Sequence, residues 1–432
     1  MEWIGILVLV VTFFTLMFVG VPISYSIGIA SLCTLLVSLG FDISITTVAQ
    51  RMTNGLNSFS LLAIPFFVLA GHIMNKGGIA LRLIDFAKIF VGRYPGGLFY
   101  INILACMLFG AISGSAVAAA SAIGGVMLPI MYRENYNKGV SVSTNLTSST
   151  TGMLIPPSNI LIIYSLASGG VSIASLFIAG YIPGILLGLS IAVIATFHVR
   201  KHGYPKGERM SIKEASKKFV DALWTLSLLI IVIGGILSGI FTATEASAIA
   251  VVYTLILSLV IYKDMKWTDL KEVLLASIKT TSVILLLIAT SCAMSWSMSF
   301  ENIPQLISEG LISLTDNIYV LLLLINVLLL IVGVFMDMTP AVLIFTPIFL
   351  PVVTQLGVDP VHFGVIMVLN LSIGLCTPPV GSVLFVGAMV GKLKITDVIK
   401  PITPFFIAMV VVLLIVTFFP ALSLWLPNLL GL

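Results

Sequence analysis

The hexapeptides GMLIPP (Gly152 to Pro157) and GLCTPP (Gly374 to Pro379) lie in opposite halves of the chain, 222 positions apart. Each is followed by an apolar run that ends in glycine. At nearly the same offset, the segment from 22 to 39 corresponds to 242 to 259. The match is weak residue by residue but keeps one register over most of each half, which indicates an internal repeat.

The composition around these hexapeptides is that of a polytopic membrane protein. Of 432 residues, 59% are hydrophobic and 9% are charged, whereas about a quarter of the residues are charged in soluble domains. Runs such as Leu226 to Gly235 are apolar all round, which excludes the alternating strands of a transmembrane barrel. Apolar stretches long enough to cross a bilayer as helices include 4–20, 56–75, 177–198, 222–240, 243–262, 274–298 and 401–426.

The distribution of Lys and Arg predicts how the halves are oriented, because basic residues accumulate in short cytoplasmic loops. The linker 199–219 is basic and is therefore predicted to be cytoplasmic. The loop 75–97 is basic, whereas its counterpart 301–317 has acidic residues and no basic one. Three further loop pairs agree, among them the loop at 263–271 with three lysines and its counterpart 41–54, in which Arg51 is the one basic residue. We therefore predict an inverted-topology repeat, with both termini outside the cytoplasm.

The same charge pattern places both ends of two long apolar segments on one side of the membrane. Each segment is then predicted to be a re-entrant hairpin of two short helices, in addition to about ten crossings. The proline pairs interrupt two further helices. The predicted fold is an all-α polytopic membrane protein with repeats 1–198 and 220–432, hairpins at about 97–131 and 318–352, and broken helices at about 139–168 and 362–391.

Irregular backbone inside a membrane is tolerated where it is buried in protein or lines a cavity. A proline pair leaves carbonyl oxygens upstream without donors, and together with hydroxyls these oxygens suit Na⁺. Because the pattern occurs twice, we expect two equivalent sodium sites. The predicted ligands are Gly110, Ser113, Gly152, Ile155 and Pro156 in one site and Gly333, Gly374, Thr377 and Val380 in the other.

Polar residues next to the four breaks are candidates for substrate contact, because the exposed helix N-termini there favour a carboxylate. Asp337 is the one acid predicted deep in the membrane at these breaks, and it either acts in transport or caps the following helix. The polar run from Asn145 to Thr151 either hydrates a pathway or bonds back to its own helix. The predicted substrate-binding residues are Ser115, Ser158, Asn159, Asp337, Thr339 and Ser382.

Other functional classes lack their signatures. The chain has no P-loop, no HExxH and no catalytic Ser/His/Asp set, so we predict no enzyme activity. No cofactor and no metal other than sodium is expected, since Cys33, Cys106, Cys292 and Cys376 are isolated in apolar segments. Structural roles are favoured for His72 and His362, and Glu245 is left as a snorkelling or pairing residue or an ion-coupling one. Without a basic patch, nucleic acid is not an expected partner.

Five motifs together resemble the large membrane subunit of tripartite ATP-independent periplasmic (TRAP) transporters, and the resemblance covers nearly the whole chain. Ala243 is a small departure, because the family often has proline before the TEA sequence. The motifs are LLAIPFFVLAGHIM (61–74), FGAISGSAVA (109–118), GMLIPPS (152–158), GIFTATEASAIAVVY (239–253) and GLCTPPVG (374–381).

The resemblance implies an elevator-type carrier of the ion transporter superfamily that is driven by Na⁺. It also implies the inner membrane of a bacterium, in which the two termini are expected on the periplasmic side. It implies two protein partners besides the lipid: a small four-helix membrane subunit, expected as a separate chain, and a periplasmic substrate-binding protein. The implied substrate is an organic acid of the C4-dicarboxylate or sialic acid class. A single-component Na⁺- or H⁺-coupled carboxylate carrier is the alternative, and a redox subunit is disfavoured because the intramembrane His pair expected for haem is absent.

Overall fold

The structure is a computed structural model that describes residues 2–207, 210–315, 317–378 and 381–432. These residues form helices and turns, with no strand among them. Within the described ranges, nine helices are long and apolar enough to cross a membrane. The prediction of an all-helical polytopic membrane protein is therefore confirmed.

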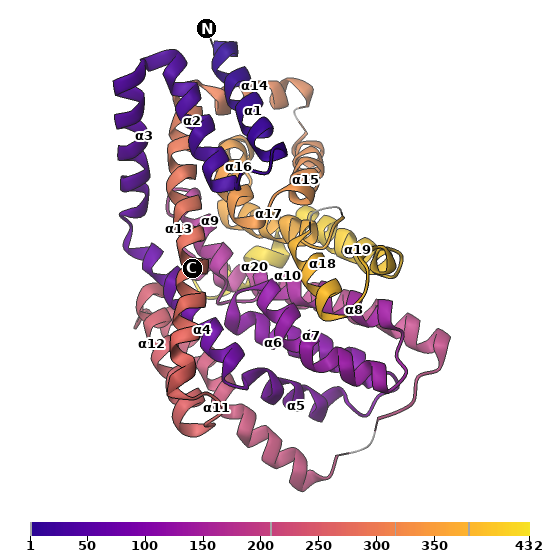
Figure 1. Cartoon of the computed structure of the whole chain (residues 1–432). Helices are drawn as coiled ribbons and strands as arrows, with labels where there is room; N and C mark the ends of the chain where they lie inside the picture. The colour runs from indigo at the N-terminus through magenta and orange to yellow at the C-terminus, as the bar shows by residue number, and fades with distance from the viewer. Residues whose placement is uncertain (1, 208–209, 316, 379–380) are drawn as a thin grey trace.

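The helices pack into one elongated body (Figure 1). The first half contains α1 (Glu2–Phe18), α2 (Ile23–Leu39), α3 (Phe41–Leu56), η1 (Phe59–Leu62), α4 (Ala63–Lys76), α5 (Ile79–Val91), α6 (Gly97–Ser113), α7 (Ala116–Arg133), α8 (Lys138–Ser149), η2 (Thr150–Met153), α9 (Asn159–Ala167) and α10 (Ile173–His202). The second half contains α11 (Ile212–Leu237), α12 (Ala243–Ile256), η3 (Leu257–Ile261), η4 (Trp267–Asp269), α13 (Leu270–Phe300), α14 (Ile303–Leu314), α15 (Ile318–Phe335), α16 (Met338–Gln355), α17 (Pro360–Gly374), α18 (Ser382–Val390), α19 (Ile395–Phe418) and α20 (Ala421–Leu429).

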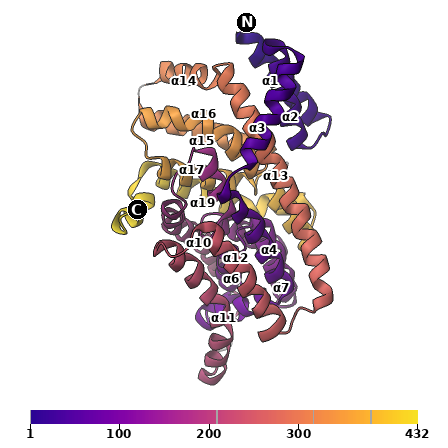
Figure 2. The ribbon, with the colours of Figure 1, turned by 90° about the vertical axis from the view of Figure 1, so that its left-hand side faces the viewer.

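Helix α13 runs along much of the molecule and joins its two ends (Figures 1 and 2). It packs against α2 and α3 near one end and against α4 closer to the other. Beside α13 lie α6 to α10 and α15 to α19, with α8 packed on α6, α7 and α19. Of these helices, α16 has the most extensive contact with α13.

The two halves contain the same sequence of interrupted elements. A helix pair with a two-residue break, α6 with α7 or α15 with α16, is followed in each half by an interrupted helix. In the first half, α8 and η2 end before the irregular residues 154–158 and α9 follows. In the second half, α17 ends at Gly374 and α18 begins at Ser382. The breaks coincide with the proline pairs because proline lacks an N–H donor and clashes with the preceding turn.

Buried asparagines join each helix pair to the interrupted helix that follows it. Asn370 on α17 donates to the side-chain oxygen of Asn326 on α15 at 2.8 Å. At equivalent positions, the side-chain amides of Asn145 on α8 and Asn102 on α6 approach to 3.1 Å. All four residues are buried. Since a buried amide without a partner is costly, these pairs fix how the interrupted helices pack.

The prediction of loops is wrong for three segments, because the structure has a helix in each of them. Residues 41–54 lie in α3, the segment 75–97 contains α5, and 301–317 contains α14. In α5, Leu83 and Ala87 are buried whereas Lys88 is partly exposed, so the helix is amphipathic. Too few residues in these segments are apolar to give the continuous run by which spans are identified.

Two predicted boundaries also differ from the structure. The predicted span 401–426 is wrong at both ends, because α19 begins at Ile395 and ends at Phe418, where Pro420 interrupts the chain before α20. The helices α10 and α11 extend into the basic linker, so that only residues between His202 and Ile212 connect them. Lysine, arginine and glutamate are good helix formers, so a helix can continue beyond the membrane into water. The position of the basic residues therefore does not predict where α10 ends and α11 begins.

Candidate functional site

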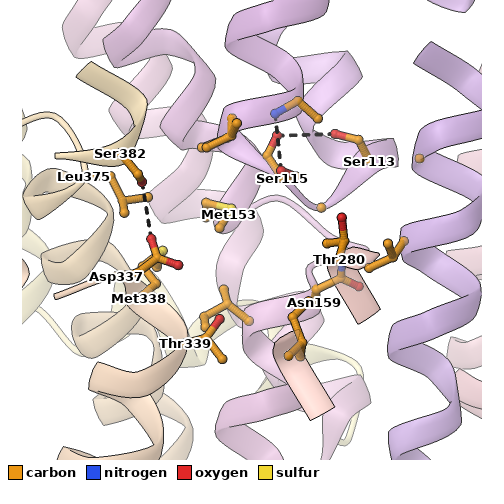
Figure 3. A pocket seen from close by; sticks show the side chains of 18 of the residues that line it. Ser113, Ser115, Met153, Asn159, Thr280, Asp337, Met338, Thr339, Leu375 and Ser382 are labelled. Atoms are coloured by element: carbon orange, nitrogen blue, oxygen red, sulfur yellow. Dashed lines mark hydrogen bonds between the residues drawn. The ribbon is translucent and has the colours of Figure 1, made fainter. Parts of the chain in front are cut away.

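A cavity of about 570 Å³ lies where the breaks of both halves meet, and we call it the central cavity. One wall is formed by α4 and α13, which contribute His72, Asn75 and Thr280. The opposite wall contains the breaks between α6 and α7 and between α15 and α16, together with the starts of α9 and α18 (Figure 3). Elements nearly half the chain apart therefore share one site.

Four helix N-termini converge on the central cavity. The first residues of these helices line it: Ala116 of α7, Asn159 of α9, Met338 of α16 and Ser382 of α18. Backbone N–H groups in a first helical turn have no partner within the helix, and the helix dipole is positive there. No lysine or arginine is among the described residues that line this cavity. The positive potential for an anion there would come from the helix ends.

Five of the six predicted substrate residues line the central cavity. They come from all four breaks and lie around one space in Figure 3. The amide oxygen of Asn159 is buried and has no hydrogen-bond partner, so it is available to a ligand. The five residues are Ser115, Asn159, Asp337, Thr339 and Ser382.

Ser158 lies behind this surface. It is fully buried, and its hydroxyl donates to the carbonyl of Met153 at 2.6 Å. It is not among the described residues that line the central cavity. This hydrogen bond closes the irregular segment before α9, which gives Ser158 a structural role in shaping the break.

Asp337 points into the central cavity from the start of α16. Its side chain makes no capping hydrogen bond to the helix, although it occupies the N-cap position. Its Oδ1 accepts a hydrogen bond from the Ser382 hydroxyl at 3.2 Å, drawn as a dashed line in Figure 3. Of the two alternatives open from the sequence, helix capping is thus not what the side chain does. The contact instead links the break between α15 and α16 to the break between α17 and α18.

The glycines predicted to bind sodium meet in pairs. A Cβ atom on Gly110 would lie 2.6 Å from the Cα of Gly152, and one on Gly374 would lie 2.7 Å from the Cα of Gly333. Real Cβ atoms do not approach a backbone so closely, so only glycine permits these crossings. In both halves, the helix before the first break therefore touches the interrupted helix through bare backbone.

The remaining predicted sodium ligands lie around these crossings. Ser113 is buried at the end of α6 and also lines the central cavity. Ile155 and Pro156 are buried in the irregular segment after η2. The hydroxyl of Thr377 donates to the carbonyl of Ile373 at 3.0 Å, which leaves its oxygen lone pairs available. Val380 lies outside the described residues, as does Pro379 of the second proline pair.

The polar run before the first proline pair bonds back to its own helix. Ser143, Thr144 and Ser148 and their neighbours are fully buried. Thr144, for example, donates to the carbonyl of Val140 at 2.9 Å, and Thr147 donates to that of Ser143 at 2.8 Å. Back-bonding hydroxyls of this kind occur where a buried helix bends or ends. The structure thus favours the second alternative for this run.

The wall formed by α4 and α13 contains residues that the sequence does not single out for substrate contact. His72 Nε2 and Thr280 Oγ1 lie 3.4 Å apart across this wall, and both line the central cavity. A structural role is predicted for His72, and Thr280 lies in the predicted span 274–298 without being singled out. The sequence signal that could identify them is that both are polar residues within membrane segments. Such residues usually lie on the helix face that is turned toward the inside of the protein. His362 by contrast is buried beside Ser423, 3.2 Å from its hydroxyl.

Glu245 is part of a helix cap. Its Oε2 accepts from the Thr242 backbone N–H and from the Thr242 hydroxyl, both at 2.8 Å, while Thr242 Oγ1 accepts from the Glu245 N–H. This reciprocal arrangement satisfies donors at the start of α12. It accounts for the TEA sequence without ion coupling.

Glu245→Ala is therefore expected to lower the thermal unfolding midpoint modestly, because the capping box at the start of α12 is lost. Glu245→Gln, which can still accept the Thr242 hydrogen bonds, should be closer to the parent. Thermal unfolding in detergent would measure both variants, and an unchanged midpoint in Glu245→Ala would contradict the structural role.

The interrupted helices, the membrane-length spans and the central cavity define a polytopic membrane transport protein. Residues 10–422 match the family described as "Tripartite ATP-independent periplasmic transporter, DctM component". The chain belongs to this family, whose members are transporter subunits and not enzymes.

Two relatives that are named for a substrate are large permease proteins of TRAP transporters. The chain is 39% identical over 429 residues to the C4-dicarboxylate TRAP transporter large permease protein DctM of Rhodobacter capsulatus, covering 96% of this chain and 97% of that one. It is 39% identical to the 2,3-diketo-L-gulonate large permease protein YiaN of Escherichia coli, with 94% of each chain covered. A protein of Salmonella typhimurium, YgiK, is described as uncharacterized and is 53% identical over 98% of this chain and 97% of its own length.

The fold is similar to that of a solved transporter. The crystal structure of the Alcanivorax borkumensis YdaH transporter covers 89% of each chain with a TM-score of 0.62. The sequence identity is 14%, so the similarity concerns the fold.

Proposed function

We propose that this chain is the transport subunit of a Na⁺-coupled TRAP carrier that imports an organic acid. The observation that carries the proposal is the convergence of four helix N-termini on a cavity without lysine or arginine among its described lining residues. Such a site attracts a carboxylate through N–H donors and helix dipoles, at little desolvation cost. Family membership supports transport, and the relatives named for C4-dicarboxylate and 2,3-diketo-L-gulonate support the organic-acid class.

Asp337 gives the cavity a second kind of selectivity. A carboxylate facing an anion would repel it, so its favourable partner is a hydroxyl group, an amine or a cation. With Ser382 already donating to one oxygen, the other oxygen remains to accept from the substrate. An organic acid with a polar group away from its carboxylate fits both features.

Sodium coupling is supported by the two glycine crossings. They bring backbone carbonyls from a helix break next to those of an interrupted helix, in the same way in each half. Hard oxygen ligands of this type, with the hydroxyls of Ser113 and Thr377, suit a desolvated Na⁺. Each crossing lies beside the helix N-termini of the substrate site, so ion binding would order the elements that contact the substrate.

The proposed orientation follows from charge at the ends of the molecule. The start of α11 carries Lys213, Lys217 and Lys218 and lies at the end away from the N-terminus and α14 (Figure 1). Basic residues face the cytoplasm, so in this proposal that end is cytoplasmic and the N-terminus, at the opposite end, is periplasmic. The C-terminus lies about midway along the molecule in both views (Figures 1 and 2). The helix pairs α6 with α7 and α15 with α16 would then be re-entrant hairpins, moving as part of an elevator against α4 and α13.

The family's tripartite architecture supplies the partners of the proposed system. A periplasmic substrate-binding protein would deliver the acid, and a small membrane subunit would stabilise the wall helices. Uptake by proteoliposomes containing both membrane subunits should then require the loaded binding protein. The acid itself is identified beforehand by a thermal-shift screen of organic acids on that binding protein. Uptake without the binding protein would favour the alternative, a single-component Na⁺- or H⁺-coupled carboxylate carrier.

Thr377→Val is expected to raise the Na⁺ concentration needed for half-maximal uptake by about tenfold, which corresponds to about 1.4 kcal/mol for one lost oxygen ligand. Uptake at varied Na⁺ measures this. Thr403→Val is the matched control, because its hydroxyl makes the same kind of bond, to the carbonyl of Ile399 at 2.9 Å, on α19. Identical Na⁺ responses in the two variants would remove Thr377 from the sodium site.

A further inference from the structure

A second cavity, of about 420 Å³, lies among α3, α9, α13 and α16, and we call it the Arg51 cavity. Its polar lining comes from two helices that pack side by side, α3 and α13 (Figures 1 and 2). The polar residues among its lining are Arg51, Asn54, Ser291, Ser295 and Ser299.

The Arg51 cavity continues the central cavity along the same helices. On α13, residues 280–287 contribute to the central cavity, and the next turns, from Ser291 onward, line the Arg51 cavity. At about 1.5 Å of rise per residue, the two linings are separated by roughly one helical turn. The helices α9 and α16 repeat this order, with residues 159–163 and then 166–167 on α9, and 338–339 and then 343 and 347 on α16.

Arg51 is held at this cavity without neutralisation. Its guanidinium carbon lies 4.8 Å from the centroid of the Trp296 ring, which orients the side chain. Within the described ranges, no carboxylate lies at salt-bridge distance from it, in contrast to Arg82, which pairs with Asp264 at 2.5 Å. The positive charge is therefore available to an anion.

Ser291 and Ser295 on α13 supply hydroxyl donors beside this charge, whereas the Ser299 hydroxyl donates to the carbonyl of Ser295 at 2.9 Å. Ser291, Ser295 and Ser299 are four residues apart and thus share one face of the helix. Ser291 is 2% exposed, and its hydroxyl has no hydrogen-bond partner. A buried hydroxyl without a partner is unfavourable unless a ligand or water completes it.

The two helices that carry these groups form one unit. Leu35, Val48 and Ala293 make a small apolar cluster of α2, α3 and α13 that is separate from the main core. Arg51 and the serines are therefore fixed relative to one another, whatever movement α9 and α16 make.

We propose that the Arg51 cavity is an anion-binding entry site, which takes the carboxylate of the organic acid on its way between the periplasm and the central cavity. Arg51 supplies the long-range attraction that the central cavity lacks, and the serine hydroxyls bind the carboxylate oxygens. The entry site rests on the proposed function for its substrate and on the proposed orientation, which places α14 and the adjacent end of α13 at the periplasmic surface.

The test uses charged thiol reagents, so that it does not depend on knowing the acid. In the full transporter in proteoliposomes, Ser295→Cys is labelled from outside with anionic 2-sulfonatoethyl methanethiosulfonate or with the cationic trimethylammonium reagent. Cys292, which lines the same cavity, is replaced by serine in every variant, so that it does not compete for the reagent. The anionic reagent should react faster, and adding Arg51→Gln should lower the anion-to-cation rate ratio by about tenfold, as one charge nearby predicts.

Controls separate a local charge effect from misfolding. Arg51→Lys should keep most of the ratio, and Lys271→Gln, which removes a charge at the far end of α13, should keep all of it. A cysteine at Thr280 in the central cavity should report a smaller dependence on Arg51. A ratio at Ser295→Cys that is the same with arginine and glutamine at 51 would overturn the proposal.

Uptake of the acid identified on the binding protein completes the test. Arg51→Gln should lower the initial rate by about tenfold at low concentrations of loaded binding protein, and Arg51→Lys should recover much of it. Unchanged uptake in Arg51→Gln would overturn an entry role even if labelling depends on the charge. If the parent transports no acid while labelling still depends on Arg51, the proposed function fails but the anion site stands.

Discussion

Gly152→Ala is expected to reduce uptake by at least a hundredfold and to destabilise the protein by about 3 kcal/mol or more. The added methyl group would collide with the backbone of Gly110. Unlike the end of a flexible side chain, this backbone cannot move aside easily. The helix break and the interrupted helix must then separate, which opens the proposed sodium site. Uptake in proteoliposomes and thermal unfolding in detergent measure the two effects.

The other glycines provide a graded control. A methyl group on Gly333 would lie 3.1 Å from the Cα of Gly374, so Gly333→Ala should be milder than Gly374→Ala, where the corresponding distance is 2.7 Å. On α7, a methyl group added to Gly125 would meet no neighbouring atom within 4 Å, so Gly125→Ala should be neutral or slightly stabilising. Equal activity of Gly152→Ala and Gly125→Ala would refute the close crossing.

Asp337→Asn is expected to lower the uptake rate by about 10- to 100-fold while the protein folds normally. The substitution keeps the size of the side chain but removes the charge that strengthens its hydrogen bonds. Because Asp337 makes no capping bond to α16, the helix loses little. Uptake rates and the unfolding midpoint, measured on the same preparations, separate function from stability.

Asp397→Asn is the matched control for this substitution. Asp397 is exposed in the first turn of α19 and is not among the described residues that line the central cavity. It should transport like the parent protein. An Asp337→Asn variant that also transports normally would show that the acid has no part in the site.

Much of the site can be predicted from proline and glycine, because these residues constrain the backbone directly. A proline pair interrupts a helix, so Pro156 and Pro157 mark one break. The offset of 222 positions between the two halves leads from this segment to Thr377 and its neighbours. Since small polar residues follow such breaks, Ser115, Asn159 and Asp337 can be selected without knowledge of the cavity. The sequence does not distinguish Ser158, whose hydroxyl turns inward to Met153.

The residues of α4 and α13 that line the central cavity cannot be predicted from the sequence, and the reason is physical. A helix such as α13 is apolar over most of its surface, so its hydrophobic pattern does not reveal which face meets the lipid and which meets a cavity. His72 and Thr280 face each other only because α4 packs on α13. Likewise α3 and α14 are not predicted as helices, since amphipathic helices lack a continuous apolar run.

Uptake driven by an imposed sodium gradient shows whether transport of the acid is coupled to Na⁺. Proteoliposomes with both membrane subunits, loaded binding protein outside and the membrane potential clamped, are given an inward Na⁺ gradient, equal Na⁺ on both sides, or a proton gradient without Na⁺. The acid is expected to accumulate above its external concentration with the Na⁺ gradient alone. Accumulation driven by the proton gradient without Na⁺ would contradict sodium coupling.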